Sequence, residues 1–170
     1  VPTLVLYGDV PLVRAETLTQ LMDAIHGGNQ EGVGVLSVKL ADPNGYGRIV
    51  RDAQDAFTAI VEHKDARADE LRINEVNTGI VVAPTQPLRD WLSKLSDDNA
   101  QREYYLTDIV THARNDGLRV TAVPCADERE VLGVNSKVDL ATVERIAQAR
   151  AAEALMTAGA QLADPARIDI

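Results

Sequence analysis

Short apolar runs that alternate with helix-like segments constrain the fold more than any other feature of this sequence. Four runs are rich in Val, Leu and Ile, the pattern of buried strands: residues 3–6, 33–40, 79–83 and 118–123. Three segments between them repeat apolar residues with the i, i+3, i+4, i+7 spacing of one helix face: Leu18, Leu21, Met22 and Ile25; Leu88, Trp91, Leu92 and Leu95; Leu106, Ile109, Val110 and Ala113. Gly27-Gly28 is expected to end the first helix. This alternation predicts an α/β domain around a mixed, largely parallel sheet.

Two further segments complete this secondary-structure prediction. Residues 42–47 are dense in turn-forming residues, and residues 48–50 and 57–62 can pair as a hairpin. Asp139 is expected to be the N-cap of a long Ala-rich helix that ends near Met156.

The charge balance excludes several classes of function. Lys and Arg total 17 against 26 Asp and Glu, which gives a net charge of −9. A binder of duplex nucleic acid needs a basic face, and a polybasic membrane-surface protein needs a cluster of cations, so the excess of acidic residues argues against both classes.

No apolar run is long enough to cross a membrane, and no signal peptide is visible. The single cysteine, Cys125, allows no internal disulfide and suits the reducing cytoplasm. We therefore expect a cytoplasmic protein that binds neither nucleic acid nor membrane.

Polar residues after two apolar segments form a candidate metal and ligand site. Tyr7, Gly8 and Asp9 directly follow the first predicted strand, and ligands of open α/β sheets bind beyond the carboxyl ends of strands. The Asp9 carboxylate offers the oxygen donor that Mg²⁺ prefers, and Gly8 leaves backbone room for a nucleotide or a sugar. Asn135, after residues 131–134, offers an amide oxygen as a neutral second ligand. The alternative is a pair of ordinary turns with solvated polar side chains.

Three more polar stretches adjoin predicted strands: Gly45–Gly47, Glu62–Lys64 and Asn77–Gly79. Glycine lets a backbone N–H approach a ligand. Alternation along a strand turns Glu62 toward a pocket and His63 toward solvent, which permits an acid–base or binding role for the carboxylate. An asparagine amide both donates and accepts hydrogen bonds, as the recognition of sugar hydroxyls and amides requires. Each stretch also has a plainer interpretation, as a turn, a solvated edge or the polar cap of a strand.

Taken together, these segments resemble one family. In chain order they are LYGDVPL (6–12), DPNGYGRIV (42–50), IVEHKDA (60–66), EVNTGI (75–80), EYYLTDIV (103–110) and GVNSKVDLATVER (133–145). YGD alone occurs in many sugar-nucleotide pyrophosphorylases, whereas GYGRI followed by IVEHKDA and NTGI is much narrower. Over essentially its whole length the chain resembles the bacterial bifunctional N-acetylglucosamine-1-phosphate uridylyltransferase and glucosamine-1-phosphate N-acetyltransferase.

The resemblance implies a domain organisation. The family joins a Rossmann-like nucleotidyltransferase domain to a left-handed β-helix that trimerises and acetylates glucosamine 1-phosphate. By analogy, residues 1–137 are a partial nucleotidyltransferase domain, 138–158 a linker helix and 159–170 the entrance to the β-helix. The family's opening Gly-rich segment, L-A-A-G-x-G-T-R-M, and the lysine after it are absent from this sequence. We therefore expect the second half of the uridylyltransferase domain, with neither activity complete in these 170 residues.

That missing half also implies an incomplete sheet. A doubly wound sheet without its first βαβ unit is expected to leave apolar side chains uncovered and the isolated chain marginally stable. The side chains expected to be affected are Val5, Leu6, Val35, Leu36, Val81 and Val82.

The resemblance also assigns roles to individual residues. Asp9 and Asn135 resemble the two protein ligands of the catalytic Mg²⁺ in the family. Tyr7 and Gly8 resemble residues that line the nucleotide-sugar site. The contacts to the N-acetylglucosamine moiety correspond to Gly47, Glu62 and Asn77. The wall of the sugar pocket corresponds to the segment with Tyr104, Tyr105 and Thr107.

The implied reaction is uridylyl transfer from UTP to N-acetylglucosamine 1-phosphate, which gives UDP-N-acetylglucosamine and pyrophosphate for peptidoglycan and lipopolysaccharide precursors. The implied cofactor is Mg²⁺. Acetyl-CoA binding and a homotrimer are implied only for a parent protein that contains the β-helix. Two alternatives remain: another sugar-1-phosphate nucleotidyltransferase, and a non-catalytic fragment that binds a sugar phosphate.

Overall fold

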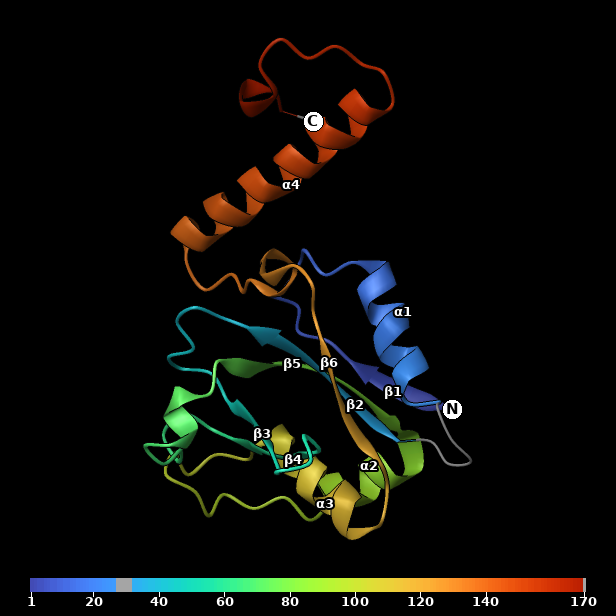
Figure 1. Ribbon diagram of the computed structural model, residues 1–170, viewed down its shortest axis with the longest axis vertical. Coiled ribbons are helices and arrows are strands. Elements are labelled where there is room, and N and C mark those ends of the chain that lie inside the picture. Colours follow the sequence, from blue (N-terminus) through green and yellow to red (C-terminus); the bar gives the residue numbers. More distant parts are fainter. Residues whose placement is uncertain (27–31, 170) are drawn as a thin grey trace. The chain divides into compact units, whose positions relative to one another are not determined.

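A computed structural model describes residues 1–26 and 32–169 of the chain (Figure 1). The predicted helix end at Gly27-Gly28 lies outside the described residues. The chain forms two compact units. Unit 1 comprises Val1–Tyr7 and Arg14–Glu128, and unit 2 comprises Gly8–Val13 and Arg129–Ile170.

Unit 1 contains a six-stranded mixed sheet. Its strands are β1 (Pro2–Val5), β2 (Val33–Lys39), β3 (Arg48–Arg51), β4 (Phe57–Val61), β5 (Glu75–Pro84) and β6 (Val120–Pro124). The order is β4-β3-β5-β2-β6, and β1 also pairs with β5. The predicted strands and the β3–β4 hairpin are confirmed.

The expectation of a largely parallel sheet is wrong, because β2 and β6 form the one parallel pair among the described strands. The reason lies in the connection from β2 to β5. A hairpin, not a crossover helix, fills that connection, so β5 returns antiparallel to β2 and lies between β1 and β2.

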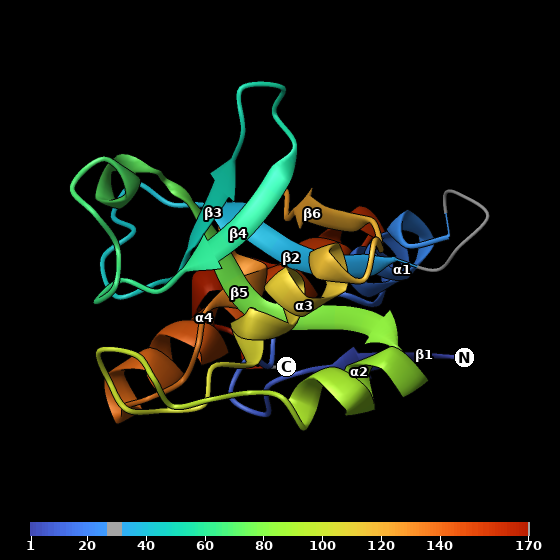
Figure 2. The ribbon, with the colours of Figure 1, turned by 90° about the horizontal axis from the view of Figure 1, so that it is seen from below.

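Helices cover both faces of this sheet. They are α1 (Ala15–Ala24), α2 (Thr85–Leu92) and α3 (Ile109–Asn115), with 3₁₀ turns at Glu70–Arg72, Leu106–Asp108 and Glu128–Val131. The α1 helix packs on β2 and β6, whereas α2 contacts β5 and α3 contacts β4 and β6 (Figure 2). Side chains alternate across a strand, so Val33 and Val35 join the core with Trp91 and Ile109, while the intervening Gly34 faces α1.

This packing corrects the expected exposure of the sheet. The four residues of β2 and β5 that were expected to be uncovered are at most 5% exposed: Val35, Leu36, Val81 and Val82. Val5 is partly buried against the core cluster, and Leu6 alone matches the expectation, at 46% exposed. The described helices thus bury the apolar side chains of the two central strands.

Unit 2 is built on α4 (Lys137–Thr157), followed by a 3₁₀ turn at Pro165–Arg167. The N-cap is Ser136 and not Asp139, since the Ser136 hydroxyl accepts a hydrogen bond from the Asp139 backbone N–H. The Asp139 carboxylate accepts in return from the Ser136 hydroxyl and the Asn135 backbone N–H. Asp139 is therefore the third residue of the helix in a reciprocal cap, a sequence pattern that places the acid three residues after the true N-cap.

Two other expectations concern the chain as a whole. The predicted division into domains at residues 1–137, 138–158 and 159–170 stays a prediction. None of the helices in the described part of the chain combines the length and apolar composition that a bilayer-spanning helix requires.

The close approach of α1 to β2 generates a stability prediction. A Cβ at Gly34 would lie 2.9 Å from Val82 Cγ1 and 3.0–3.1 Å from side-chain atoms of Ile25 and Leu21. We expect Gly34→Ala to reduce the free energy of unfolding by about 1–3 kcal/mol, which thermal unfolding should report as a lower Tm. Gly8→Ala is the matched control, because no atom lies within 4 Å of its added Cβ. Equal Tm values for the two variants would contradict the tight packing.

Candidate functional site

A polar groove of about 370 Å³ opens in unit 1 among β5, the turn before β3, the end of β4 and the loop before α3. It brings together predicted site residues that are far apart in the sequence: Tyr7, Gly47, Glu62, Asn77, Tyr104, Tyr105 and Thr107. We call this the polar groove. Their convergence is a property of the fold, and the role of each residue stays a prediction.

Glu62 is a half-buried carboxylate that lines the polar groove. It follows the last residue of β4, and its Oε1 accepts a hydrogen bond of 3.0 Å from the Thr107 hydroxyl. Burial raises the pKa of the Glu62 carboxyl, the hydrogen bond from Thr107 opposes this shift, and the negative charges of Asp65 and Asp108 add to it. The groove therefore holds a carboxylate that takes up a proton more readily than a solvated one.

Gly47 lies against this carboxylate. A Cβ at Gly47 would come within 3.1–3.2 Å of the two Glu62 carboxylate oxygens and 3.0 Å of Ile60 Cγ2. The Gly47 carbonyl accepts a 2.9 Å hydrogen bond from the Asn77 N–H, so the three predicted sugar contacts are directly linked. The glycine is required here for space, whereas Gly45 has the positive φ, +84°, that shapes the turn.

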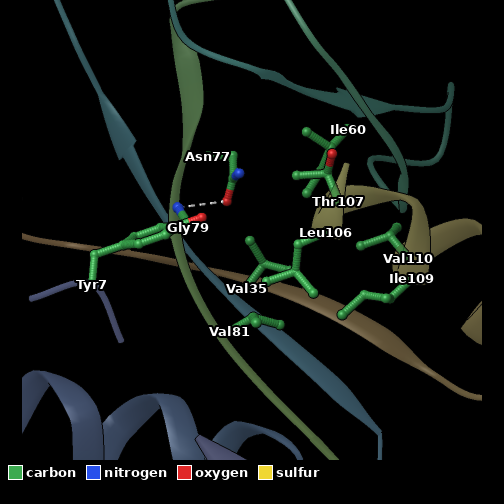
Figure 3. Close-up of a pocket in the computed structure, with 10 residues that line it drawn as sticks. All are labelled: Tyr7, Val35, Ile60, Asn77, Gly79, Val81, Leu106, Thr107, Ile109 and Val110. Carbon is green, nitrogen blue, oxygen red and sulfur yellow. Dashed lines mark hydrogen bonds between the residues drawn. The ribbon is translucent and has the colours of Figure 1, made fainter. Parts of the chain in front are cut away.

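Asn77 was predicted to precede a strand, but it lies inside β5. Between the pairs Val35–Val81 and Ser37–Asn77, three residues of β5 face one residue of β2, a bulge in the ladder. Gly79 has φ +84° at this bulge, and its N–H donates to Asn77 Oδ1 at 2.9 Å (Figure 3). The bulge thus holds the Asn77 amide beside the groove.

The Tyr7 ring packs on the same bulge. A Cβ at Gly79 would overlap the ring, so the absence of a side chain at this position is what admits Tyr7 (Figure 3). Apolar side chains, including Val35 and Val81, line a small cavity of about 20 Å³ that shares Tyr7, Asn77 and Gly79 with the groove. The apolar core therefore begins directly behind the polar groove.

The outer wall of the groove is tied to the β4 end by a residue that the sequence did not single out. Asp65 accepts hydrogen bonds from the Ala100 N–H, at 3.0 Å, and from the Tyr105 hydroxyl, at 3.2 Å. Gln101 donates to the same hydroxyl at 3.0 Å, while Tyr104 is 70% exposed. The only available signal was the position of Asp65 within the IVEHKDA motif, since its partners are 35 and 40 residues away.

The two candidate metal ligands belong to unit 2, as does Gly8. The Val134 N–H donates to the Asp9 carbonyl at 2.8 Å, which joins the Asp9 and Asn135 segments, and both of these side chains are exposed. A carboxylate oxygen and an amide oxygen are both donors that suit Mg²⁺. Within the described residues, no group of three or more His, Cys, Asp or Glu side chains is arranged to hold a metal ion.

Sequence comparison confirms the predicted resemblance. The chain is 59% identical over 169 residues to the bifunctional protein GlmU of Burkholderia thailandensis and 58% identical over 170 residues to that of Ralstonia pickettii. These matches cover 99% and 100% of the chain but 37% of each relative, so the chain spans little more than a third of their length. No family model matches the chain.

Solved structures confirm the α/β nucleotidyltransferase fold. One match is a putative glucose-1-phosphate thymidylyltransferase from Bacillus anthracis in complex with a sucrose, with a TM-score of 0.58, 16% identity and coverage of 97% of this chain and 58% of that one. Another is a CMP:2-keto-3-deoxy-manno-octonic acid synthetase complexed with CTP, with a TM-score of 0.55, 17% identity and coverage of 94% and 63%. At these identities the likeness concerns the fold alone.

The raised pKa of Glu62 predicts a pH dependence of stability. The folded chain binds the Glu62 proton more tightly than the unfolded chain, so the stability this proton contributes is present below the ordinary pKa of 4.5 and is lost as the pH rises through the folded value. Glu62→Gln should therefore gain stability relative to the wild type as the pH rises from 4 to neutrality, measured by thermal unfolding.

A second variant tests the cause of this effect. Thr107→Val removes the hydrogen bond that opposes the shift in the Glu62 pKa and should steepen the pH dependence. Wild-type and Glu62→Gln profiles that run parallel across this range would show that Glu62 is not responsible.

Proposed function

On the premise that the chain corresponds over 99% of its length to a segment of proteins named bifunctional GlmU, we propose that it forms the sugar-phosphate half of a uridylyltransferase. The proposed reaction joins UTP and N-acetylglucosamine 1-phosphate into UDP-N-acetylglucosamine with release of pyrophosphate. The phosphate of the sugar attacks the α-phosphorus of UTP, and positioning and charge neutralisation supply most of the catalysis.

The observation that carries this proposal is the convergence of Gly47, Glu62 and Asn77 on one groove. The Glu62 carboxylate accepts hydrogen bonds from hydroxyl groups, and the Asn77 amide can both donate and accept. Such groups suit a sugar with hydroxyl and acetamido substituents. The Tyr7 ring and Leu106, which line both the groove and the small apolar cavity behind it, offer the hydrophobic surface on which the carbon skeleton of a sugar packs.

The phosphate groups of this reaction require a cation, and we assign its protein ligands to Asp9 and Asn135. When bound, Mg²⁺ neutralises phosphate charge so that two anions can approach. The chain's own contribution is to hold one charged and one neutral oxygen donor on segments joined by the Val134–Asp9 hydrogen bond. Asp139 adds support, because its carboxylate accepts from the Asn135 N–H at 3.1 Å.

The wider assignment follows from the same premise. We propose a partial nucleotidyltransferase domain at residues 1–137, a linker helix at 138–158 and the entrance to a β-helix at 159–170. A parent protein that contains the β-helix would be a trimer that also uses acetyl-CoA. The proposed location is the cytoplasm, and the proposed pathways are those of peptidoglycan and lipopolysaccharide precursors.

Calorimetry tests the proposed ligand directly. In the presence of Mg²⁺, UDP-N-acetylglucosamine should bind the chain more tightly than UDP-glucose, because the groove recognises the acetamido group. Equal affinities would favour another sugar-1-phosphate nucleotidyltransferase. A chain that binds neither compound would overturn the proposal.

Gly47→Ala tests the sugar subsite. The added methyl group would crowd the Glu62 carboxylate, so we expect the Kd for N-acetylglucosamine 1-phosphate to rise about tenfold, as for the loss of a hydrogen bond. Binding of UTP should change less, and calorimetry with both compounds measures the difference. Equal weakening of both would indicate a general defect of the turn instead.

Asp9→Asn tests the metal ligand. Removing the charged oxygen should raise the Mg²⁺ concentration needed for half-maximal binding of UDP-N-acetylglucosamine by roughly tenfold or more. The thermal transition should be unchanged, because the Asp9 side chain is exposed. Asn135→Ala should raise the same requirement by a smaller factor, since it removes a neutral donor. An unchanged Mg²⁺ requirement in either variant removes that residue from the metal site.

A further inference from the structure

Arg48, the residue after Gly47, is a buried cation that the proposed reaction does not use. It is 1% exposed, and its Nε is buried without a hydrogen-bond partner. Within the described residues, no carboxylate forms an ion pair with Arg48. Burying a guanidinium without a counter-charge is costly. The hydrogen bonds that Arg48 does form therefore indicate its role.

Those contacts join the two segments that carry the predicted sugar contacts. The Nη1 group donates to the Tyr46 carbonyl, directly before Gly47. The Nη2 group lies 3.4 Å from His63 Nδ1, directly after Glu62, and His63 must accept because a guanidinium has no acceptor. This contact corrects the expected orientation of His63, which is half-buried rather than turned to solvent.

The bond to Tyr46 has a consequence for Gly47. In a planar trans peptide, the carbonyl of one residue and the N–H of the next point in opposite directions. Since Arg48 holds the Tyr46 carbonyl, the Gly47 N–H is directed away from Arg48. No hydrogen bond from this N–H to another described residue is present, and Gly47 lines the polar groove. The N–H is thus a free donor in a fixed orientation.

We propose that Arg48 is a positioning residue for sugar recognition: it orients the Gly47 N–H through Tyr46 and holds Glu62 in place through His63. The ligand class is an N-acetylated hexosamine 1-phosphate, so this inference rests on the function proposed above. Arg48 itself does not line the groove and need not touch the ligand.

Arg51 provides a matched control on the same strand. It donates to the Glu75 carboxylate at 2.9 and 3.0 Å and lines a different cavity, bounded also by Lys39 and Cys125. Arg48→Lys and Arg51→Lys each keep the charge and remove the forked geometry of the guanidinium. Binding of N-acetylglucosamine 1-phosphate and glucose 1-phosphate is measured by calorimetry. The Gly47 amide is followed by NMR in ¹⁵N-glycine-labelled chain.

Arg48→Lys should raise the Kd for N-acetylglucosamine 1-phosphate about tenfold and reduce the preference over glucose 1-phosphate. It should also move the Gly47 amide resonance while the Gly117 resonance stays in place. Arg51→Lys should leave both the Kd and the Gly47 resonance unchanged. A folded Arg48→Lys chain with wild-type affinity, preference and Gly47 resonance overturns the proposal.

Two further outcomes are informative. If Arg48→Lys does not fold, His63→Ala removes one of the two contacts and should raise the same Kd about threefold; an unchanged Kd overturns the link to Glu62. If the wild-type chain binds neither sugar phosphate, the proposed function fails. In that case, comparing the Gly47 amide resonance of the ligand-free wild type with that of Arg48→Lys decides whether Arg48 orients this peptide.

Discussion

The central strand β5 is the constraint on which the sheet and the polar groove both depend. It pairs with β1, β2 and β3, so the register of these strands is set against a single backbone. The bulge at Gly79 interrupts that register at the point where the groove opens. The same glycine frees the space that the Tyr7 ring occupies and donates to the Asn77 amide. A local irregularity in the most heavily paired strand thus becomes the base of the site.

Two charges of opposite sign lie at or behind the groove on the side of β3 and β4: the half-buried Glu62, which lines it, and the buried Arg48, which does not. Glu62 accepts from Thr107 and faces Gly47, whereas Arg48 is turned away and holds the backbone behind them. Each charge is costly to bury, and each is compensated by hydrogen bonds to a neighbouring segment and not by a direct ion pair with the other. This arrangement leaves the Glu62 carboxylate and the Gly47 N–H available to a ligand. In the proposed sugar subsite, such rigidly held polar groups would distinguish sugars that differ in one substituent.

The candidate metal ligands illustrate how a helix cap can support a site. Asn135 directly precedes the N-cap of α4, and the reciprocal bonds of Ser136 and Asp139 fix its backbone. The Val134 N–H then ties this segment to the Asp9 carbonyl. These hydrogen bonds fix the backbone at Asp9 and Asn135, while both side chains are exposed.

The sequence by itself determined the strands, the helices and the polar stretches between them, because these follow from local spacing of apolar residues and from turn chemistry. It also identified Gly47, Glu62 and Asn77 as residues worth attention. Only the tertiary structure decided that β5 is antiparallel to β2, that Asn77 lies within a bulged strand, and that His63 faces Arg48. These outcomes arise from strand pairing and side-chain contacts between residues distant in the chain. The free energy of such a contact depends on both segments that form it. The periodicity of one segment shows which of its faces is apolar but does not identify the segment that packs against it.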